Sequence, residues 1–197
     1  MKVLVFDTET TGLPKWRGQD AYKGGWPDIV SICWVILDYN KEIKRRYYVI
    51  KPDRWTIPIE STKIHGITQE YAMGNGVELK TVLKEFKEDM EQSRWIVAHN
   101  LEFDTNVMIA AYYWRLRDDP KRFWNKSKEF CSMLQGSKEL NILDEQGRQK
   151  WPKLDDLYEI SCGKKAPADA HNAQRDVNVL IEILKNRNWL DALLLIA

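Results

Sequence analysis

The stretch KVLVFDTETTG, Lys2 to Gly12, decides the fold. Four apolar residues, Val3 to Phe6, follow one another without the alternation of a half-exposed strand, which is typical of a central strand covered on both faces. Asp7 and Glu9 come directly after this run. Because they are two apart in an extended chain, their side chains leave the same face, with Cα atoms about 7 Å apart. The sequence therefore predicts a buried strand that presents two carboxylates together.

Asp7 and Glu9 allow two interpretations. Two carboxylates that converge on one point repel each other, and burial further disfavours their charged forms. A hard divalent cation such as Mg²⁺ or Mn²⁺ between them removes both penalties. The alternative is that both residues are solvated parts of a turn or helix cap. The pair alone leaves the two interpretations open.

The composition is that of a water-soluble globular protein. Of the 197 residues, 44% are hydrophobic and 30% are charged, and the mean hydropathy is −0.52. A chain of this length most simply forms one domain, residues 1–197, around one core. No apolar run approaches the roughly 18 residues that a membrane-spanning helix needs, and the N-terminus shows no export signal. We therefore expect a cytoplasmic protein without a membrane partner.

The charge and the aromatic residues bear on nucleic-acid binding. The formal net charge is +1, which argues against a long basic stripe that would bind duplex through its phosphates. Nine Trp and eight Tyr residues are present, and several adjoin basic residues, such as Trp16 with Arg17 and Tyr22 with Lys23. Stacking surfaces next to cations suit single strands, although most aromatic residues of a protein belong to its core. Any nucleic-acid contact is therefore expected to be local.

The pattern of apolar residues predicts the order of strands and helices. Strands are predicted at 2–7, 29–37, 44–51, 94–100 and 128–134. Helices are predicted at 77–90, 103–114 with Trp114 on the inward stripe, 153–161 and 172–186, with a loop over 14–28 and an apolar tail over 188–197. The tail is expected to dock within the chain or against a second copy. This order predicts an α/β fold of three layers, with a central five-stranded mixed sheet flanked by helices.

Two further carboxylates are placed near the N-terminal ends of predicted helices. Asp104 and Asp176 each fall at the margin of the apolar stripe of their helix, so each is expected to be neither fully buried nor outside. Both side chains can then point along the surface of the sheet and not into water. Taken singly, an aspartate in the first turns of a helix is more simply explained by the helix macrodipole.

The three histidines lie at loops or element boundaries. His65 and His99 are expected to form hydrogen bonds with the surrounding loops, because a lone histidine is more often structural than catalytic. His171 lies five residues before Asp176, at the N-terminus of the last long helix. Its imidazole could reach a water molecule bound to a metal that Asp176 holds, which makes His171 a candidate general base.

Three motifs together carry a resemblance to a known family. FDTETTG, HNLEFD and HNAQRD, in this order, resemble the three exonuclease motifs of the DEDDh, or DnaQ-like, 3′–5′ exonucleases, and IHGIT is similar to that family as well. The resemblance covers the chain from Val3 to about Leu184. It implies a ribonuclease H-like fold and a hydrolase that uses two divalent cations, Mg²⁺ or Mn²⁺, to cut phosphodiester bonds from a 3′ end.

The resemblance also implies roles for the acids and for His171. Asp7, Glu9 and Asp176 would hold the cation that carries the attacking water, and Asp7 with Asp104 would hold the cation at the leaving 3′ oxygen. His171 would be the general base. These five residues, His171, Asp7, Glu9, Asp104 and Asp176, form the expected catalytic set.

By position in the motifs, the terminal nucleotide would be gripped by Thr10, Thr11, Leu13, Asn100 and Phe103. The chain departs from a minimal family member in the long loop from Lys15 to Pro27. We expect this loop to flank the cleft and to contact the strand upstream of the terminal nucleotide through Trp16, Tyr22 and Trp26.

The substrate and the partners remain open at this point. We favour single-stranded DNA or DNA 3′ ends, with a polymerase or another processing complex as a possible protein partner. An exoribonuclease that trims RNA ends or short oligoribonucleotides is the alternative, because no residue is an evident reader of the 2′-hydroxyl. A nucleic-acid-binding module that has lost catalysis is a further alternative, although it has no need for four clustered acids. A structural protein leaves the acids unexplained.

Overall fold

The computed structural model describes residues 1–16, 18–124, 129–169 and 171–195. The strands are β1 (Lys2–Thr10), β2 (Ile29–Asp38), β3 (Lys41–Val49), β4 (Trp95–Ala98) and β5 (Glu129–Cys131). The helices are α1 (Ile59–His65), α2 (Gln69–Asn75), α3 (Leu79–Glu91), α4 (Leu101–Ala110), α5 (Ser132–Leu140), α6 (Leu154–Cys162), α7 (Ala173–Asn186) and α8 (Trp189–Leu195). Short helical turns lie at Ala21–Lys23, Ala111–Leu116 and Pro120–Arg122.

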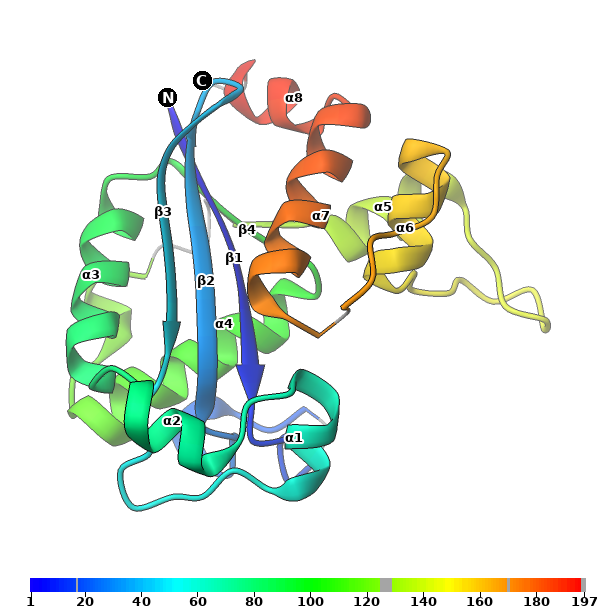
Figure 1. Cartoon of the computed structure of the whole chain (residues 1–197). Helices are drawn as coiled ribbons and strands as arrows, with labels where there is room; N and C mark the ends of the chain where they lie inside the picture. Colours follow the sequence, from blue (N-terminus) through cyan, green and yellow to red (C-terminus); the bar gives the residue numbers. More distant parts are fainter. Residues whose placement is uncertain (17, 125–128, 170, 196–197) are drawn as a thin grey trace.

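The strands form one mixed sheet in the order β3-β2-β1-β4-β5 (Figure 1). β1, β2 and β3 are joined as an antiparallel meander, whereas β4 pairs in parallel with β1, and β5 pairs in parallel with β4. Within the described residues, the predicted five-stranded mixed sheet is therefore confirmed.

The central strand β1 is longer than the sequence predicted. Its pairing with β2 continues through Asp7, opposite Cys33, and Glu9, opposite Ser31. The two acids thus lie inside the strand, because their backbone groups find partners in β2. The register shifts only between Glu9 and Thr10, where the strand ends.

The alternation of side chains along β1 separates two cores. Leu4 and Phe6 pack with residues of α3 and α4 on one face of the sheet. Val3 and Val5 pack with residues of α6, α7 and α8 on the other face. The sheet therefore has helices on both faces, which confirms the predicted three layers (Figure 1). Because side chains alternate, Asp7 and Glu9 lie on the α7 face and Thr8 on the α4 face.

Two parts of the sequence prediction were wrong, and one segment had no prediction. The segment between β3 and α3, for which no element was predicted, contains two short helices, α1 and α2, which are too short to show a clear periodicity. Of the predicted strand 128–134, Lys128 lies outside the described residues, Glu129–Cys131 forms β5, and α5 begins at Ser132. Trp114 is 40% exposed, and not inward, because the helix becomes π-helical at Ala111 and the extra residue per turn shifts the stripe.

The apolar tail packs within the chain. Trp189, Leu190 and Leu193 of α8 are buried in the same core as Val3 and Val5. This resolves the two options for the tail in favour of intramolecular docking for these residues. None of the helices that the structure describes is long and apolar enough to cross a membrane.

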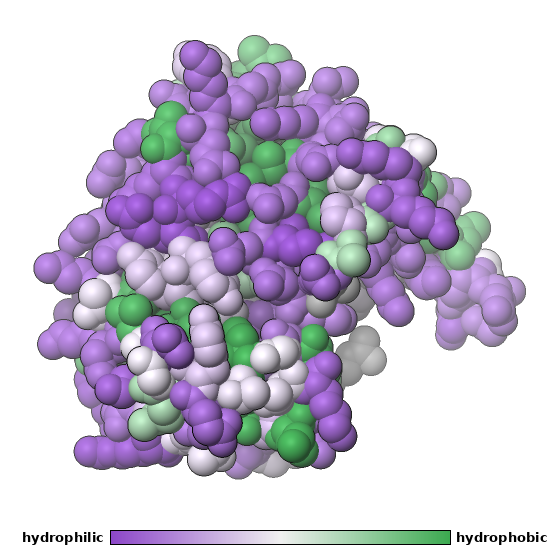
Figure 2. All heavy atoms as spheres, viewed as in Figure 1, coloured by the Kyte–Doolittle hydropathy of each residue, from purple (hydrophilic) through white to green (hydrophobic). Residues whose placement is uncertain are grey.

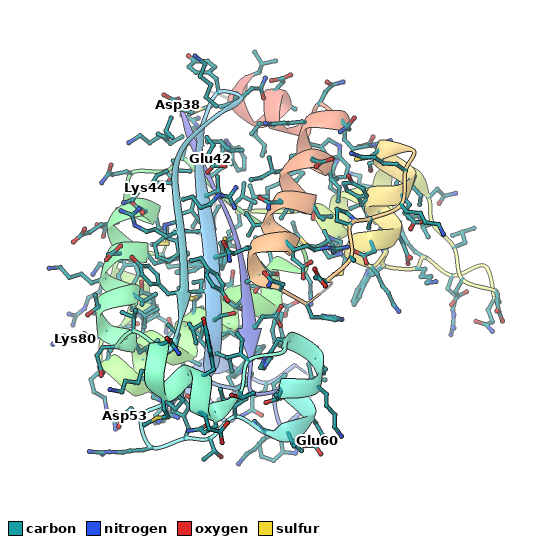
Figure 3. All side chains as sticks on the ribbon, viewed as in Figure 1. Asp38, Glu42, Lys44, Asp53, Glu60 and Lys80 are labelled. Atoms are coloured by element: carbon teal, nitrogen blue, oxygen red, sulfur yellow. The ribbon has the colours of Figure 1, made fainter. Side chains whose placement is uncertain are left out.

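The face of the molecule drawn in Figure 3 mixes acidic and basic side chains. Among those that project from it are Asp38, Glu42, Lys44, Asp53, Glu60 and Lys80. This mixture agrees with the low net charge. Less hydrophilic side chains gather over α1 and α2 (Figure 2). The exposed apolar residues of these helices are Ile59, Ile64, Tyr71 and Met73.

Candidate active site

Three of the predicted acids meet at the end of β1. Asp7 and Glu9 project from β1, and Asp176 projects from the first turn of α7. One carboxylate oxygen from each residue lies within 4.8 Å of the others. This convergence follows from the strand, because Asp7 and Glu9 share the face that α7 covers.

The start of α7 is determined by Asn172. Its side-chain Oδ1 accepts hydrogen bonds from the backbone N–H groups of Gln174, at 3.1 Å, and Arg175, at 3.3 Å. Such a cap satisfies donors that the first helical turn leaves unpaired. The cap fixes where the helix begins and therefore where Asp176 faces the sheet.

Arg175 is a site residue that the sequence analysis missed. Its Nη1 donates to Asp176 Oδ1 at 2.8 Å and to Asp155 Oδ1 at 2.6 Å, and its Nε donates to the backbone oxygen of Pro167 at 3.1 Å. The Arg175 side chain is only 10% exposed. One guanidinium thus connects an acid of the cluster, α6 and the segment that leads to His171.

Asp104 is held apart from the three clustered acids. Its Oδ1 accepts hydrogen bonds from the Thr8 hydroxyl at 2.7 Å and from the Thr8 backbone N–H at 3.1 Å. Thr8 can make these bonds because it faces α4, whereas Asp7 and Glu9 face α7. The expectation that neither Asp104 nor Asp176 is fully buried was wrong, because they are 3% and 9% exposed. The two donors from Thr8 compensate the burial of Asp104.

All four acids have a raised pKa. Burial is the largest cause for each of them. It raises the pKa of Glu9 to about 8 and that of Asp104 to about 7, and the charges of neighbouring acids contribute to both shifts. The pKa of Asp7 lies well above its usual range, and the charge of Asp104 is the largest contribution after burial. Asp104 is therefore close enough to interact with the cluster. A set of buried oxygen donors that resist ionisation fits hard divalent cations.

The acids line a cavity of about 470 Å³. His171 also lines this cavity and is exposed, so the candidate base and the four acids share one space. Of the residues expected to grip a terminal nucleotide, all but Thr11 line it: Thr10, Leu13, Asn100 and Phe103. The Thr11 hydroxyl instead accepts a hydrogen bond from the Asp28 N–H at 3.0 Å and ties the turn after β1 to the next loop.

The α1 helix contributes a wall of this cavity that the sequence analysis missed. Ser61, Ile64 and His65 lie on one face of α1, three and four residues apart, and all three line the cavity. Ile64 is 56% exposed, and Leu13, another apolar residue that lines the cavity, is 81% exposed. The IHGIT motif was the available signal, because it includes two of these three residues.

The other two histidines form hydrogen bonds, but only His65 bonds to the surrounding loop, as the sequence predicted for both. His65 Nδ1 accepts from the N–H of Ile67 at 3.1 Å. His99 Nε2 lies 3.0 Å from the backbone oxygen of Pro152, so this nitrogen carries the proton, and Nδ1 accepts from the Ser132 hydroxyl at 2.9 Å. Burial lowers the pKa of His99 to about 4 and keeps it neutral. Its partners are distant segments of the chain and not the adjacent loop.

The three aromatic residues of the 14–28 loop take different positions. Trp26 packs against Phe103, with ring centroids 5.8 Å apart, and lines a second cavity. Tyr22 packs against Tyr113 at 5.0 Å. Trp16 is 66% exposed and is not among the residues that line either cavity. Only Trp26 of the three thus reaches the neighbourhood of the acids.

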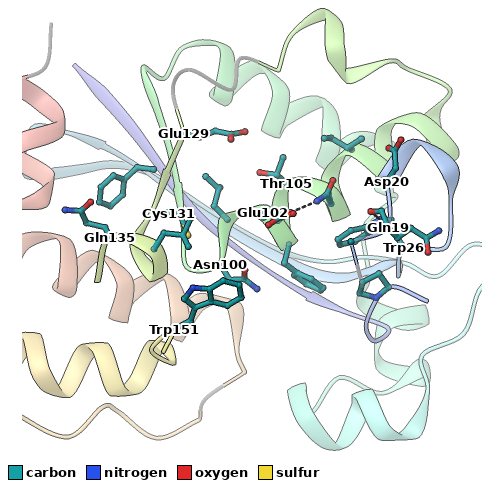
Figure 4. A pocket seen from close by; sticks show the side chains of 18 of the residues that line it. Gln19, Asp20, Trp26, Asn100, Glu102, Thr105, Glu129, Cys131, Gln135 and Trp151 are labelled. Atoms are coloured by element: carbon teal, nitrogen blue, oxygen red, sulfur yellow. Dashed lines mark hydrogen bonds between the residues drawn. The ribbon is translucent and has the colours of Figure 1, made fainter. Parts of the chain in front are cut away.

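The second cavity is larger and adjoins the first. It has a volume of about 1000 Å³ and lies between the 14–28 loop, α4, β5 and the segment around Trp151 (Figure 4). Asn100 and Phe103 line both cavities, so the two spaces meet at the N-terminal end of α4.

In sequence, this chain is similar to known exonucleases. The model of the RNase_T family, described as exonuclease, matches residues 4–184. The chain is 30% identical to DNA polymerase III subunit epsilon of Rickettsia prowazekii over 110 residues, which are 55% of this chain and 43% of that protein. It is 28% identical to exonuclease CP81 of Escherichia phage 186 over 188 residues, which are 92% of this chain and 85% of that protein. The chain thus spans less than half the length of the epsilon subunit.

Solved structures of exonuclease I show the same fold. The Escherichia coli enzyme in complex with a dT13 oligonucleotide matches 97% of this chain and 43% of its own, with a TM-score of 0.72 and 18% identity. Exonuclease I of Methylocaldum szegediense matches 96% of this chain and 41% of its own, with a TM-score of 0.68 and 19% identity. The predicted ribonuclease H-like fold is therefore confirmed.

Proposed function

The chain belongs to the RNase_T exonuclease family, and from this membership we propose that it is a metal-dependent 3′–5′ exonuclease. Its proposed substrate is the 3′ end of single-stranded DNA, from which it releases nucleoside 5′-monophosphates. The observation that carries the proposal is the convergence of Asp7, Glu9 and Asp176, whose carboxylate oxygens approach within 4.8 Å of one another.

The proposed cofactors are two divalent cations, Mg²⁺ or Mn²⁺. Asp7, Glu9 and Asp176 would hold one cation, and Asp7 together with Asp104 would hold the second. The cations, when bound, supply a hydroxide nucleophile at neutral pH and stabilise negative charge on the attacking and leaving oxygens. Support comes from the raised pKa of each acid, since a cation offsets the cost of keeping four buried carboxylates charged.

His171 is the proposed general base. It lines the same cavity as the acids and is exposed, so its imidazole can accept a proton and return it to solvent. His65 and His99 are less suited to this role, because burial lowers the pKa of each and a ring nitrogen of each is already hydrogen-bonded to the protein.

The terminal nucleotide would lie in the cavity of the acids. Leu13 and Phe103 offer apolar surface to its base and sugar, and Thr10 and Asn100 offer polar groups. Among the described residues that line this cavity there is no lysine or arginine. The phosphate would therefore depend on the cations for charge neutralisation, which makes binding of the 3′ end metal-dependent as well.

DNA is the favoured substrate because of the relatives. The epsilon subunit is named as part of a DNA polymerase, and the exonuclease I structure was solved with a DNA oligonucleotide. A polymerase is accordingly the protein partner that we propose to test. Trp16, Tyr22 and Thr11 stay proposed nucleic-acid contacts. The single-domain organisation and the cytoplasmic location also stay predictions.

Digestion of matched oligonucleotides tests the proposed function. DNA and RNA of one sequence, single- and double-stranded and labelled at the 5′ end, are incubated with Mg²⁺, Mn²⁺ or EDTA, and the products are identified by mass. We expect stepwise shortening of single-stranded DNA and mononucleotide release with either metal, and neither in EDTA. Faster shortening of RNA would favour the exoribonuclease alternative. Binding without any cleavage by the wild-type protein would favour the binding module.

Asp7→Asn is the matched control for this experiment. The amide keeps the size of the side chain and removes one negative charge of the cluster, so the fold should persist while cleavage is lost. Full activity of the Asp7→Asn protein at saturating Mg²⁺ would contradict the proposed site.

A further inference from the structure

The larger cavity continues from the proposed cleavage site. It meets the cavity of the acids at Asn100 and Phe103, which line both. Figure 4 shows Trp151 beside Asn100 on one side, and the loop that carries Gln19 and Trp26 on the other, with α4 between them. A strand whose terminal nucleotide lies at the acids therefore has space for further nucleotides in this direction.

Trp151 is an exposed indole on a fixed backbone. Its side chain lies in the larger cavity, and the residue is 57% exposed. On one side, the backbone oxygen of Lys150 accepts a hydrogen bond from the Ser137 hydroxyl at 3.0 Å. On the other side, the backbone oxygen of Pro152 accepts one from His99 Nε2 at 3.0 Å. A flat aromatic surface that is already positioned loses little entropy when a base stacks on it.

The opposite wall is aromatic as well. Trp26 packs against Phe103, and its Nε1 donates to the backbone oxygen of Gln19 at 2.9 Å, so its ring is oriented before any ligand arrives. Phe103 belongs to both cavities. The space between Trp151 and Trp26 is thus bounded by aromatic side chains on both sides.

The charges of the larger cavity favour bases over phosphates. Among the described residues that line it, Asp20, Glu102 and Glu129 are acidic and Lys138 is the one basic residue. A phosphate backbone next to these three acids would be repelled, whereas an uncharged base would not. The strand would therefore enter with its bases toward the aromatic walls and its phosphates toward solvent.

We propose that this cavity is a second subsite, which binds nucleobases of the single strand 5′ to the scissile bond, with Trp151 as the stacking surface. The inference rests on the proposed function and deepens it, because it assigns the upstream part of the substrate. In this proposal His99 is a positioning residue, because its hydrogen bond to Pro152 connects the Trp151 segment to the cleavage site.

The test measures affinity and turnover with a 5′-fluorescein-labelled (dT)8. Fluorescence anisotropy in EDTA, where the metal-dependent binding of the 3′ end is absent, gives the Kd of the remaining contacts, and release of the first 3′ nucleotide in Mg²⁺ gives kcat/KM. We expect Trp151→Ala to weaken both by about 5-fold to 100-fold, the range that base–aromatic stacking covers per base. Trp151→Phe keeps an aromatic ring and should recover most of the loss. Tyr39→Asn, at the exposed turn between β2 and β3, should match the wild type.

Abasic substrates make the test specific. In (dT)8, one base at a time is removed from the upstream positions. At the position that stacks on Trp151, the wild type should lose about as much affinity as Trp151→Ala loses on intact (dT)8. The Trp151→Ala protein should lose almost nothing further there.

Two results would overturn the subsite. One is that, at every abasic position, the loss of affinity from the missing base and the loss from Trp151→Ala simply add. The other is that Trp151→Phe behaves like Trp151→Ala, which would make the residue a structural support. A wild-type protein that cleaves nothing would instead count against the proposed exonuclease. The anisotropy measurements with wild type and Trp151→Ala on intact and abasic (dT)8 would still show whether the subsite binds a base.

Discussion

Arg175 and Asp176, neighbours in sequence, form a direct ion pair, with Nη1 2.8 Å from Oδ1. The arginine is thereby placed behind an acid that we propose as a metal ligand. The same nitrogen contacts Asp155, and Nε contacts the backbone oxygen of Pro167. Arg175 therefore orients one proposed ligand and, through the same group, the segment that precedes His171.

Replacement of Arg175 should weaken metal binding. Loss of a residue that orients a metal ligand typically costs about 10-fold to 100-fold in affinity. We expect a loss in this range for Arg175→Gln and a smaller one for Arg175→Lys, which keeps the charge but not the planar fork. Titration calorimetry with Mn²⁺ measures the affinity. Arg45→Lys, in a surface pair with Glu42, is the control and should bind Mn²⁺ like the wild type. Unchanged affinity in Arg175→Gln would contradict the positioning role.

The hydrogen bond from Thr8 to Asp104 should contribute to stability. Thr8→Val removes the hydroxyl donor and leaves a buried carboxyl group with one fewer partner, which costs about 1–3 kcal/mol in the free energy of unfolding. Thr105→Val is a matched control, because the buried Thr105 hydroxyl has no hydrogen-bond partner among the described residues and its loss should be nearly neutral. Urea denaturation measures both variants. Equal effects of the two substitutions would show that the Thr8–Asp104 bond contributes nothing.

Stability without divalent cations should fall as the pH rises from about 6.5 to 8. Burial raises the pKa of Glu9 to about 8 in the folded protein, so in this range the folded state binds more protons than the unfolded state. The stability that comes from protonated Glu9 is present below the ordinary pKa and is lost as the pH passes through the raised one. Asp104, with a pKa of about 7, acts in the same direction.

The melting temperature in EDTA, measured against pH, checks this dependence. Saturating Mg²⁺ should flatten the curve, because bound cations keep the acids ionised at every pH of the range. A melting temperature that rises between pH 6.5 and 8 in EDTA would contradict the raised pKa of these acids in the metal-free folded protein.

His171→Ala should separate catalysis from metal binding. We expect kcat to fall by about 10² to 10⁴, the usual contribution of a general base, while Mn²⁺ affinity and unfolding stay unchanged. Steady-state kinetics on (dT)8 and calorimetry on the same preparation measure the two properties. An effect on KM alone would make His171 a binding residue.

Local sequence patterns were enough to predict the layers of the fold and the positions of Asp7, Glu9 and Asp176 in it. The apolar run of β1 and the spacing of Asp7 and Glu9 predicted the shared face, and the predicted helix 172–186 differs from α7 by one residue. Asp104 was placed at the margin of the apolar stripe, and not in the interior, because a helical wheel does not show a partner such as Thr8, which is 96 residues away in sequence.

The features that were missed depend on tertiary contacts. In the sequence, Arg175 is not distinguished from an ordinary surface arginine. Its role depends on the packing of α6, which places Asp155 beside it. Trp151 lies in a polar stretch without periodicity, and its position depends on hydrogen bonds from distant Ser137 and His99. Ile64 lies on a helix of seven residues, which is too short for an apolar period to be visible.

The most direct test of the central claim is the location of bound Mn²⁺ by anomalous scattering from a crystal soaked in manganese. We predict density in coordination distance of the carboxylates of Asp7, Glu9 and Asp176, with a second ion between Asp7 and Asp104. Ions bound only elsewhere, or none at saturating Mn²⁺ while these carboxylates remain together, would contradict the account.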